Sequence, residues 1–497
     1  MAENHHIPDV LADRYASAAM VTIWSPRGKV MAERRLWVTV LEAQQDLGVG
    51  VPDGVVEAYR AVMDEVDLDS IRERERVTRH DVKARIEEFC ALAGHQHIHK
   101  GMTSRDLTEN IEQLQIRDSL QLVRDKLVAV ICALGRRAAE HAELVMVGRS
   151  HNVPAQATTL GKRFANYGEE ALVALDRLED LLGRYRLRGL KGPVGTQQDQ
   201  LDVLMGIQKD QLDMQPGEIN KVAGLEQRVA AGLGFEAVMG SVGQVYPRSL
   251  DYDVVSALVQ VSSAPANLAR TIRLMAGHGL ISEGFRAGQV GSSAMPGKRN
   301  ARTCERICGL SIVVQGYADM VASLVGDQWN EGDVSCSVVR RVALPGAFLA
   351  LDGQLEAALT VLNELEVFGD EIDAELTMYI PDLLATPLLM AAVGAGANRE
   401  EAHRAITEHL VGYRSKMSSR PLGVRAAGSS VDVPDLLDSL ESDPRLCLTR
   451  DQLGDVVHYK QRLCGAASTQ AREFAKQAEL LAEKHPDTAH YQPESIL

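Results

Sequence analysis

Aromatic residues are scarce in this chain of 497 residues, in which Phe, Trp and Tyr together make up 4%. Sheets are usually packed with aromatic and β-branched side chains, so this scarcity argues against a β-rich fold. Alanine, leucine, glutamate and arginine, which are good helix formers, are abundant instead. With 45% hydrophobic residues, the chain can bury a large core and form more than one domain. We therefore expect an all-α fold.

Cysteine is also rare, and the seven cysteines form no CxxC pair. Their odd number excludes a fully paired disulfide framework, and the missing CxxC pairs argue against a zinc knuckle. We expect reduced thiols and a cytoplasmic protein. The cysteines are Cys90, Cys132, Cys304, Cys308, Cys336, Cys447 and Cys464.

Long apolar runs and an excess of positive charge are missing too. The most apolar stretch, residues 383–397, is too short for a bilayer and contains Pro387. The first residues lack the basic and apolar regions of a signal peptide, so we expect no leader and no membrane partner. A formal net charge of -15 argues against a nucleic-acid partner. A small anionic substrate stays compatible, because a few inward-pointing cations can dominate a pocket.

Helical periodicity is what the sequence does contain. Between Ser119 and Leu144, apolar residues such as Leu120, Val123 and Leu127 recur at steps of three and four, which places them on one face of a helix. Helices of this length with apolar residues on several faces indicate burial against other copies of the chain. The same pattern predicts helices over residues 160–185, 252–276, 303–325, 345–367 and 453–484.

We expect the helices to form three domains, residues 1–118, 119–367 and 368–497. Short breaks that carry glycine, proline or small polar residues separate the helices. Because loops on a rigid scaffold tend to hold functional residues, we expect the unusual chemistry there. The breaks are residues 94–104, 147–154, 189–198, 240–247 and 283–300.

The most informative break contains GQVGSSAMPGKRN, residues 288–300. A phosphate-binding P-loop needs four residues between its first glycine and the Gly-Lys pair, followed by Ser or Thr. Here five residues separate Gly291 from Gly297, and Lys298 is followed by arginine. The P-loop interpretation therefore fails, and a flexible surface loop is the plain alternative. Residues 295–296, Met-Pro, are poorly suited to a solvated linker.

The segment from Gly291 to Asn300 resembles the signature of the fumarase/aspartase superfamily, GSSxMPxKxN. Further segments are similar to those of its adenylosuccinate lyase family, in the same order, over about residues 10–345. The resemblance implies an all-α homotetramer with a long central bundle and active sites shared by three subunits. It implies β-elimination of fumarate from a purine nucleotide, with adenylosuccinate giving AMP and SAICAR giving AICAR, without a cofactor or metal. The matching segments are residues 14–15, 78–82, 99–104, 148–151, 191–197 and 243–246, with Ser337 and Arg341.

This reaction explains the catalytic roles that the resemblance implies. A proton must leave the carbon beside a carboxylate, and preorganised donors must stabilise the resulting aci-carboxylate. The resemblance makes Ser292 the general base, although a serine hydroxyl is normally too weakly acidic to be ionised. It makes His151 the general acid for the leaving nitrogen. It makes Glu305 the acidic partner of a catalytic histidine, and His99 a further catalytic residue.

Two further sets of side chains would hold the substrate by the same resemblance. The guanidinium group of arginine can bind a phosphate through two parallel hydrogen bonds, which accounts for the arginines of the nucleotide set. Its members are distant in sequence and would have to meet in the fold or across subunits. The carboxylate donors are Thr103, Ser104, Gln244, Lys298 and Asn300, with Ser293 and Met295 in the same loop. The nucleotide set is Arg14, Tyr15, Arg79, His80, Asp81, Ser337 and Arg341.

A histidine cluster suggests a different site. The alternation of His95, His97 and His99 would allow zinc or copper to bind one side of an extended segment. No carboxylate lies at a convincing spacing, and only His99 matches the lyase pattern. We therefore expect no metal.

Gly332 departs from the resemblance, because it stands where relatives have arginine, and Arg248 or Arg340 would have to replace that cation. Another fumarate-releasing enzyme of the superfamily, such as argininosuccinate lyase, fumarase or aspartase, is an open alternative. A catalytically silent scaffold is a second alternative. Residues 14–15, 79–81 and 191–197 favour the nucleotide substrate over the other superfamily substrates. The intact Ser292, Lys298, Asn300 and His151 argue against a silent scaffold.

Overall fold

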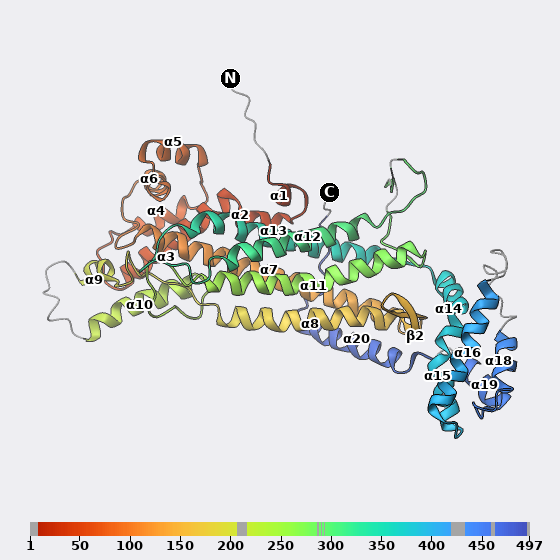
Figure 1. The fold of residues 1–497 in the computed structure, drawn as a ribbon. Helices are drawn as coiled ribbons and strands as arrows, with labels where there is room; N and C mark the ends of the chain where they lie inside the picture. Colours follow the sequence, from red (N-terminus) through yellow and green to blue (C-terminus); the bar gives the residue numbers. More distant parts are fainter. Residues whose placement is uncertain are drawn as a thin grey trace.

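The computed structural model describes residues 8–205, 216–285, 288–289, 291–292, 294–418, 433–458 and 463–494. Within these residues the protein is built from helices and two short pairs of antiparallel strands. The all-α expectation is confirmed. The ribbon forms a long bundle with small groups of helices at its two ends (Figure 1).

Helices of 5 to 21 residues form the N-terminal part of the molecule (Figure 1). The first three begin where a side-chain oxygen of Asp9, Ser17 or Ser25 accepts backbone N–H groups of the first turn, which satisfies donors that lack a helical partner. The helices are α1 (Val10–Arg14), α2 (Ala18–Trp24), α3 (Pro26–Asp46), α4 (Val55–Ala61), α5 (Leu68–Thr78) and α6 (Asp81–Ala93).

Five long helices make the central bundle, and α20 (Ala467–Lys484) packs along it. The first of them begins at Ser104 rather than near Ser119, so the expected division after residue 118 falls inside a continuous helix. The last begins at Cys336 and keeps Pro345 in its interior, whereas the sequence pattern placed its start at that proline. The bundle helices are α7 (Ser104–Glu140), α8 (Leu160–Arg184), α11 (Ser249–Gly277), α12 (Arg302–Ala322) and α13 (Cys336–Glu364); α9 (Gln198–Met205) and α10 (Pro216–Gly232) lie between α8 and α11 in the chain.

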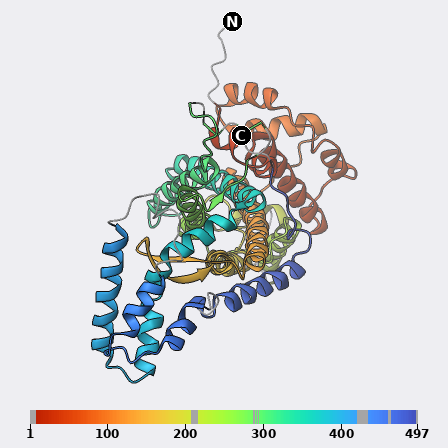
Figure 2. The ribbon, with the colours of Figure 1, turned by 90° about the vertical axis from the view of Figure 1, so that its right-hand side faces the viewer.

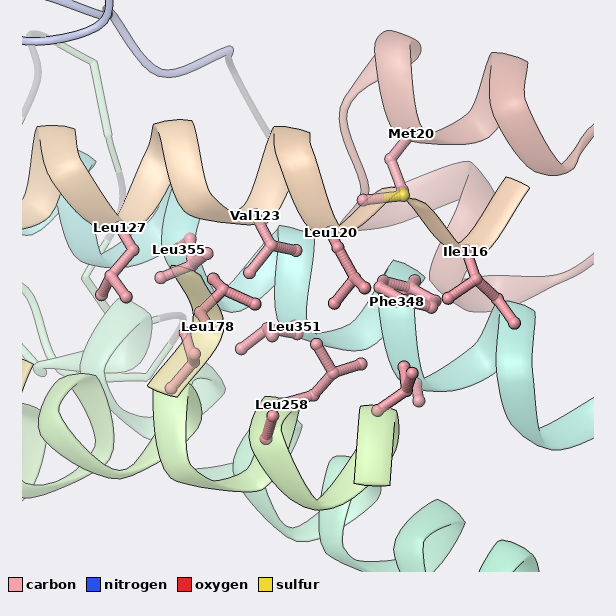
Figure 3. Close-up of a cluster of buried hydrophobic side chains, with 14 of the residues drawn as sticks. Met20, Ile116, Leu120, Val123, Leu127, Leu178, Leu258, Phe348, Leu351 and Leu355 are labelled. Carbon is pink, nitrogen blue, oxygen red and sulfur yellow. The ribbon is translucent and has the colours of Figure 1, made fainter. Parts of the chain in front are cut away.

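The bundle core is aliphatic. Leu120 and Val123 of α7 face Leu351 of α13 and Leu258 of α11 (Figure 3), and these side chains are fully buried. Burying each leucine stabilises the fold by roughly 1.5–3 kcal/mol. In the described part of the chain, α13 is the one single helix long and apolar enough to cross a membrane, and the bent pair Gly369–Leu383 and Ala385–Gly394 passes only if taken as one span. In α13, 89% of the most apolar window is buried inside the protein. It is the central core helix.

Two strand pairs depart from the sequence prediction, one at an expected break and one that includes the end of the helix predicted over residues 345–367. β1 (Val145–Ser150) and β2 (Val153–Thr159) form an antiparallel hairpin where the sequence suggested an irregular break. β3 (Ile281–Ser282) pairs with β4 (Glu366–Val367) at the base of the signature loop. Val147 of the hairpin packs with Leu376 and Leu383, so the hairpin joins the bundle to the C-terminal helices.

The C-terminal helices form a separate group at one end of the bundle (Figures 1 and 2). They have their own apolar cluster, which includes Leu388, Leu436 and Leu453. The single helix predicted over residues 453–484 is wrong, because α19 ends at His458 and α20 begins at Ala467. The helices are α14 (Gly369–Leu383), α15 (Ala385–Gly394), α16 (Arg399–Ser418), α18 (Val433–Glu441) and α19 (Arg450–His458).

Candidate active site

His99 lies in the turn before α7 in a left-handed backbone conformation, with φ 66°. The indole N–H of Trp37 donates to its Nδ1 at 3.0 Å, so the neutral ring carries its proton on Nε2. Burial lowers the pKa of His99 to about 4. The neutral imidazole is therefore the working form near neutral pH. The other rings of the histidine cluster have different partners, since His97 Nδ1 lies 3.0 Å from the Lys100 ammonium.

Two more predicted residues meet at the same place. Ser104 Oγ is 3.4 Å from His80 Nε2, and His80 caps α6 while Ser104 begins α7. Asp81 lies beside them and accepts from Arg85 at 2.9 Å. Burial alone would raise the pKa of Asp81, but the Arg85 guanidinium lowers it below its usual value. The fold thus gathers His80, Asp81 and Ser104 at the start of α7.

The start of α13 adds further members of the nucleotide set. Arg341 Nη2 is 3.9 Å from Asp81 Oδ2. Ser337 Oγ accepts a hydrogen bond of 3.0 Å from Arg105, a residue that the sequence analysis did not select. Arg105 also pairs with the buried Glu109 at 3.0 Å. Its place directly after Ser104 was the signal that could have drawn attention to it.

Asp106 fixes this end of α7. Its Oδ2 accepts the Thr103 N–H at 2.9 Å, and its Oδ1 accepts from Arg188 Nη1 at 2.7 Å. The same Oδ1 accepts the N–H groups of Lys191 and Gly192 at 2.8 and 3.1 Å. Asp106 and Arg188 are fully buried. One carboxylate therefore positions the Thr103–Ser104 turn against the 191–197 segment, although nothing in the sequence pattern singled it out.

Gln244 lies next to the glycine that departs from the resemblance. Its N–H donates to the Glu331 carbonyl at 2.7 Å. Gly332 has φ 133°, and a Cβ there would lie 2.9 Å from Val245 Cγ2. A side chain at this position would require Val245 to shift and would strain the backbone.

The replacement cations suggested for Gly332 are both committed elsewhere. Arg248 pairs with Glu109 at 2.5 Å. Arg340 pairs with Asp251 at 2.7 Å and with Glu112 at 2.5 Å. Both guanidinium groups are buried in these ion pairs, so neither is available to a ligand. Arg105 is partly exposed, with 12% of its side-chain surface accessible.

The signature loop stands at the other end of the bundle. Ser292 Oγ accepts the N–H groups of Met295 and Ala294 at 3.0 and 3.3 Å, a geometry that would stabilise negative charge on that oxygen. Asn300 Nδ2 donates to the Gly291 carbonyl at 3.0 Å and closes the loop. Met295 is exposed. Ser293 lies outside the described residues.

Glu283 anchors the base of this loop. Its carboxylate oxygens accept the N–H groups of Thr303 and Cys304 at 2.9 Å each, so a buried acid caps the first turn of α12. The loop lines a cavity of about 630 Å³, whose walls include Lys298, Asn300 and Glu305. Arg270 and Arg273 of α11 line the same cavity. Glu305 Oε1 is 3.9 Å from Arg273 Nη2.

His151 lies at the tip of the β1–β2 hairpin. His151 and Asn152 both have positive φ, 51° and 62°, which is the geometry of a two-residue hairpin turn. The side chain is exposed. Arg149 secures the hairpin by donating to Glu375 of α14 at 2.6 Å. The tip therefore presents an imidazole outward from a fixed base.

Arg14 and Tyr15 lie at a third place. A Cβ on Gly353 would be 2.6 Å from the Tyr15 carbonyl oxygen, so this turn packs directly on α13. Arg306 of α12 stacks on the Tyr15 ring, with 5.6 Å between the guanidinium carbon and the ring centre. Gly353 is sixteen residues beyond Ser337 on α13, or about 24 Å along the helix.

The predicted residues thus form separate groups in one subunit. Gln244 and the start of α7 lie at one end of α11, and the signature loop follows its other end. This helix has 29 residues, which span about 43 Å. Figure 1 shows α9 and α6 at one end of the molecule and β2 and α14 at the other. One subunit cannot bring Ser292 to Thr103 and Ser104.

Comparisons with known proteins place the chain among lyases. A family model described as "Lyase" matches residues 25–316. The chain is 32% identical to adenylosuccinate lyase from Schistosoma mansoni, covering 82% of this chain and 84% of that protein. It is 34% identical to adenylosuccinate lyase from Saccharomyces cerevisiae, covering 81% and 82%. The similarity to adenylosuccinate lyase from Caenorhabditis briggsae, at 27% identity, covers 98% of both chains.

Solved structures agree on the fold. The structure of 3-carboxy-cis,cis-muconate lactonizing enzyme from Pseudomonas putida matches with a TM-score of 0.77 at 19% identity, over 96% of this chain and 100% of that one. Fumarate lyase from a Mesorhizobium species matches with a TM-score of 0.75 at 20% identity, over 93% and 98%. At these identities the likeness concerns the fold alone.

Proposed function

The chain belongs to the adenylosuccinate lyase family of the fumarase/aspartase superfamily, and we propose that its active sites form where three copies of the chain meet. It is a carbon–nitrogen lyase that acts on a small nucleotide. The reaction is elimination of fumarate from adenylosuccinate to give AMP, and from SAICAR to give AICAR. Roles of individual residues and the assembly are our proposals.

The length of α11 is the observation that supports a site shared between subunits. Its 29 residues separate its two ends by about 43 Å, and Gln244 precedes one end while the Ser292 loop follows the other. A single substrate can contact both only if they come from different subunits. Exposed apolar side chains on the bundle helices support an assembly, because a second copy would remove them from water. They include Val173, Leu274, Ile312, Val338 and Val342. We propose a homotetramer.

We propose that Ser292 removes the proton from the carbon beside the substrate carboxylate. Two backbone N–H groups already point at its Oγ, and they would stabilise the alkoxide once the loop excludes water. Lys298 and Asn300, with Thr103, Ser104 and Gln244 of another subunit, would donate to the aci-carboxylate. The carbon–nitrogen bond then breaks, and fumarate forms.

The departing nitrogen needs a proton, and we propose that His151 supplies it. The exposed tip of the hairpin can reach a neighbouring subunit, where Glu305 would orient a histidine and raise its basicity. His99 would act as a neutral hydrogen-bond donor through Nε2, since Trp37 occupies Nδ1. Ser292 is a neutral hydroxyl once it has taken the substrate proton, and it becomes the alkoxide again by giving that proton to water.

On the nucleotide side, we propose that Arg14, Tyr15, Arg79, His80, Asp81, Ser337 and Arg341 bind phosphate, ribose and base. Arg105 would take the place of the arginine that Gly332 lacks, because it is the partly exposed cation that contacts Ser337. We also propose a cytoplasmic location. All seven cysteines are free thiols, which suits a reducing compartment.

The substrate assignment is tested by measuring fumarate release from adenylosuccinate, argininosuccinate, malate and aspartate with the same enzyme preparation. We expect turnover of adenylosuccinate alone among these. Turnover of argininosuccinate without adenylosuccinate would refute the assignment. The assembly is tested by measuring specific activity on dilution together with sedimentation velocity. Activity should fall as tetramers dissociate, and full activity in monomers would refute the shared site.

A further inference from the structure

The segment after α20 returns to the N-terminal helices. Figure 1 shows α20 on the lower side of the bundle and α1 on the upper side. Residues 485–494 connect the two: Ala489 is buried in the main core, and the Glu494 carboxylate accepts the Ala18 N–H at 3.0 Å. Ala18 is the first residue of α2, where backbone donors have no helical partner.

A buried charge cluster lies beneath this segment. The Lys126 ammonium of α7 contacts the Asp352 carboxylate and, at 2.6 Å, Glu356 Oε1, both of α13. It also donates to Ser17 Oγ at 2.8 Å. All four residues are fully or almost fully buried. Asp352 Oδ2 in turn accepts the Ser17 N–H at 2.6 Å. The turn between α1 and α2 is thereby bonded to the bundle.

The C-terminal segment completes this cluster. Tyr491 OH donates to Glu356 Oε1 at 2.7 Å, and the Glu494 N–H donates to Glu356 Oε2 at 2.6 Å. Glu356 therefore binds both Lys126 and the C-terminal segment. Because Glu494 also accepts from Ala18, the same segment holds the α1–α2 turn from outside the bundle.

Tyr15 and Arg14 sit immediately before this turn. The Tyr15 carbonyl packs against Gly353, one residue after Asp352, which binds Ser17. The contacts of residues 17 and 18 therefore hold the backbone directly after Arg14 and Tyr15.

We propose that residues 491–494 act as a strap that fixes the α1–α2 turn, and that Tyr491 and Glu494 are positioning residues for the nucleotide phosphate and base. The strap sets nucleotide affinity without touching the substrate. This inference rests on the proposed role of Arg14 and Tyr15. Loosening the strap should allow those two side chains to sample other directions, which weakens binding while leaving the reacting groups in place.

The test uses the full-length chain with Tyr491→Phe and Glu494→Gln, and a deletion of residues 491–497. Glu479→Gln, which changes an exposed carboxylate of α20, is the matched control. Hydrogen exchange is measured for the amides of Ser17 and Ala18, and kcat and KM for adenylosuccinate. We expect exchange at both amides to rise by roughly tenfold or more in the deletion. KM should rise several-fold while kcat stays within about twofold.

Unchanged exchange at Ser17 and Ala18 in the deletion would overturn the strap. Faster exchange with an unchanged KM would overturn its role in nucleotide binding. A fall in kcat without a change in KM would do the same. The proposed function is judged separately, because failure of the unmodified enzyme to release fumarate from adenylosuccinate would refute it whatever the exchange shows. Tyr491→Phe, which removes one hydroxyl, keeps the test meaningful if the deletion fails to fold.

Discussion

Changing Asp106 to asparagine replaces one oxygen at the first turn of α7 and should destabilise both the fold and the site. The carboxylate accepts from the Thr103 N–H through Oδ2 and from Arg188, Lys191 and Gly192 through Oδ1. Asparagine has one acceptor oxygen, so its NH₂ group must face either the Thr103 N–H or the three other donors. The negative charge opposite the buried Arg188 also disappears.

The size of the expected loss in unfolding free energy follows from the burial of Asp106 and Arg188. Removing one partner of a buried ion pair costs about 3–5 kcal/mol, and a part-buried N–H left without an acceptor costs about 1–3 kcal/mol. Both effects concern the same carboxylate and are not additive. We therefore expect the free energy of unfolding to fall by about 3–5 kcal/mol. Since Thr103 and Ser104 move with Asp106, kcat/KM should fall as well.

Urea unfolding at a fixed chain concentration measures this loss. Asp180→Asn is the matched control, because Asp180 pairs with Arg184 at 2.8 Å on an exposed helix surface and should change stability by less than about 1 kcal/mol. A loss below about 1 kcal/mol for Asp106→Asn, with normal turnover, would refute the reasoning.

Three further predictions use the same structure. Ser292→Ala should reduce kcat by about 10²- to 10⁴-fold or more while preserving the oligomer and substrate binding; near-normal fumarate release would reject Ser292 as the base. The pKa of His99, about 4 in the fold, lies below its unfolded value near 6.5. The unfolded chain therefore binds the proton more tightly, and about 3 kcal/mol of stability that is present above pH 6.5 should be lost as pH falls toward 4. Thermal melting across this range measures the loss, which should be smaller in His99→Gln, and equal slopes would contradict the burial argument. Gly332→Ala should lower stability by about 1–3 kcal/mol, because it adds a Cβ at φ 133°, and an unchanged melting temperature would show that the position is relaxed.

The long helices were predictable from sequence because their apolar residues recur with the helical period. Residues 160–185 and 252–276 coincide closely with α8 and α11. The hairpin was missed, since its turn residues, His151 and Asn152, are not the Asn-Gly pair that marks such turns. The join of α19 to α20 was missed because the apolar spacing continues across residues 459–466.

Among the site residues, some could be recognised from the sequence and others could not. The signature loop is contiguous, so Ser292, Lys298 and Asn300 were recognisable from their order alone. Asp106 was not, because its importance comes from Arg188 and Lys191, which are about 80 positions away and meet it only in the fold. The same reason explains why Arg340 looked available in the sequence. Its ion pairs with Asp251 and Glu112 become visible only when α7, α11 and α13 pack together.

Mixing two inactive variants tests the shared site most directly. Ser292→Ala and His151→Ala are prepared separately, dissociated, mixed in equal amounts and reassembled, and fumarate release from adenylosuccinate is measured. If each site takes these residues from different subunits, sites with both native residues form in the mixture. Activity should then return to about one quarter of the unmodified enzyme under random assembly. Mixed tetramers that remain as inactive as either parent would contradict the account.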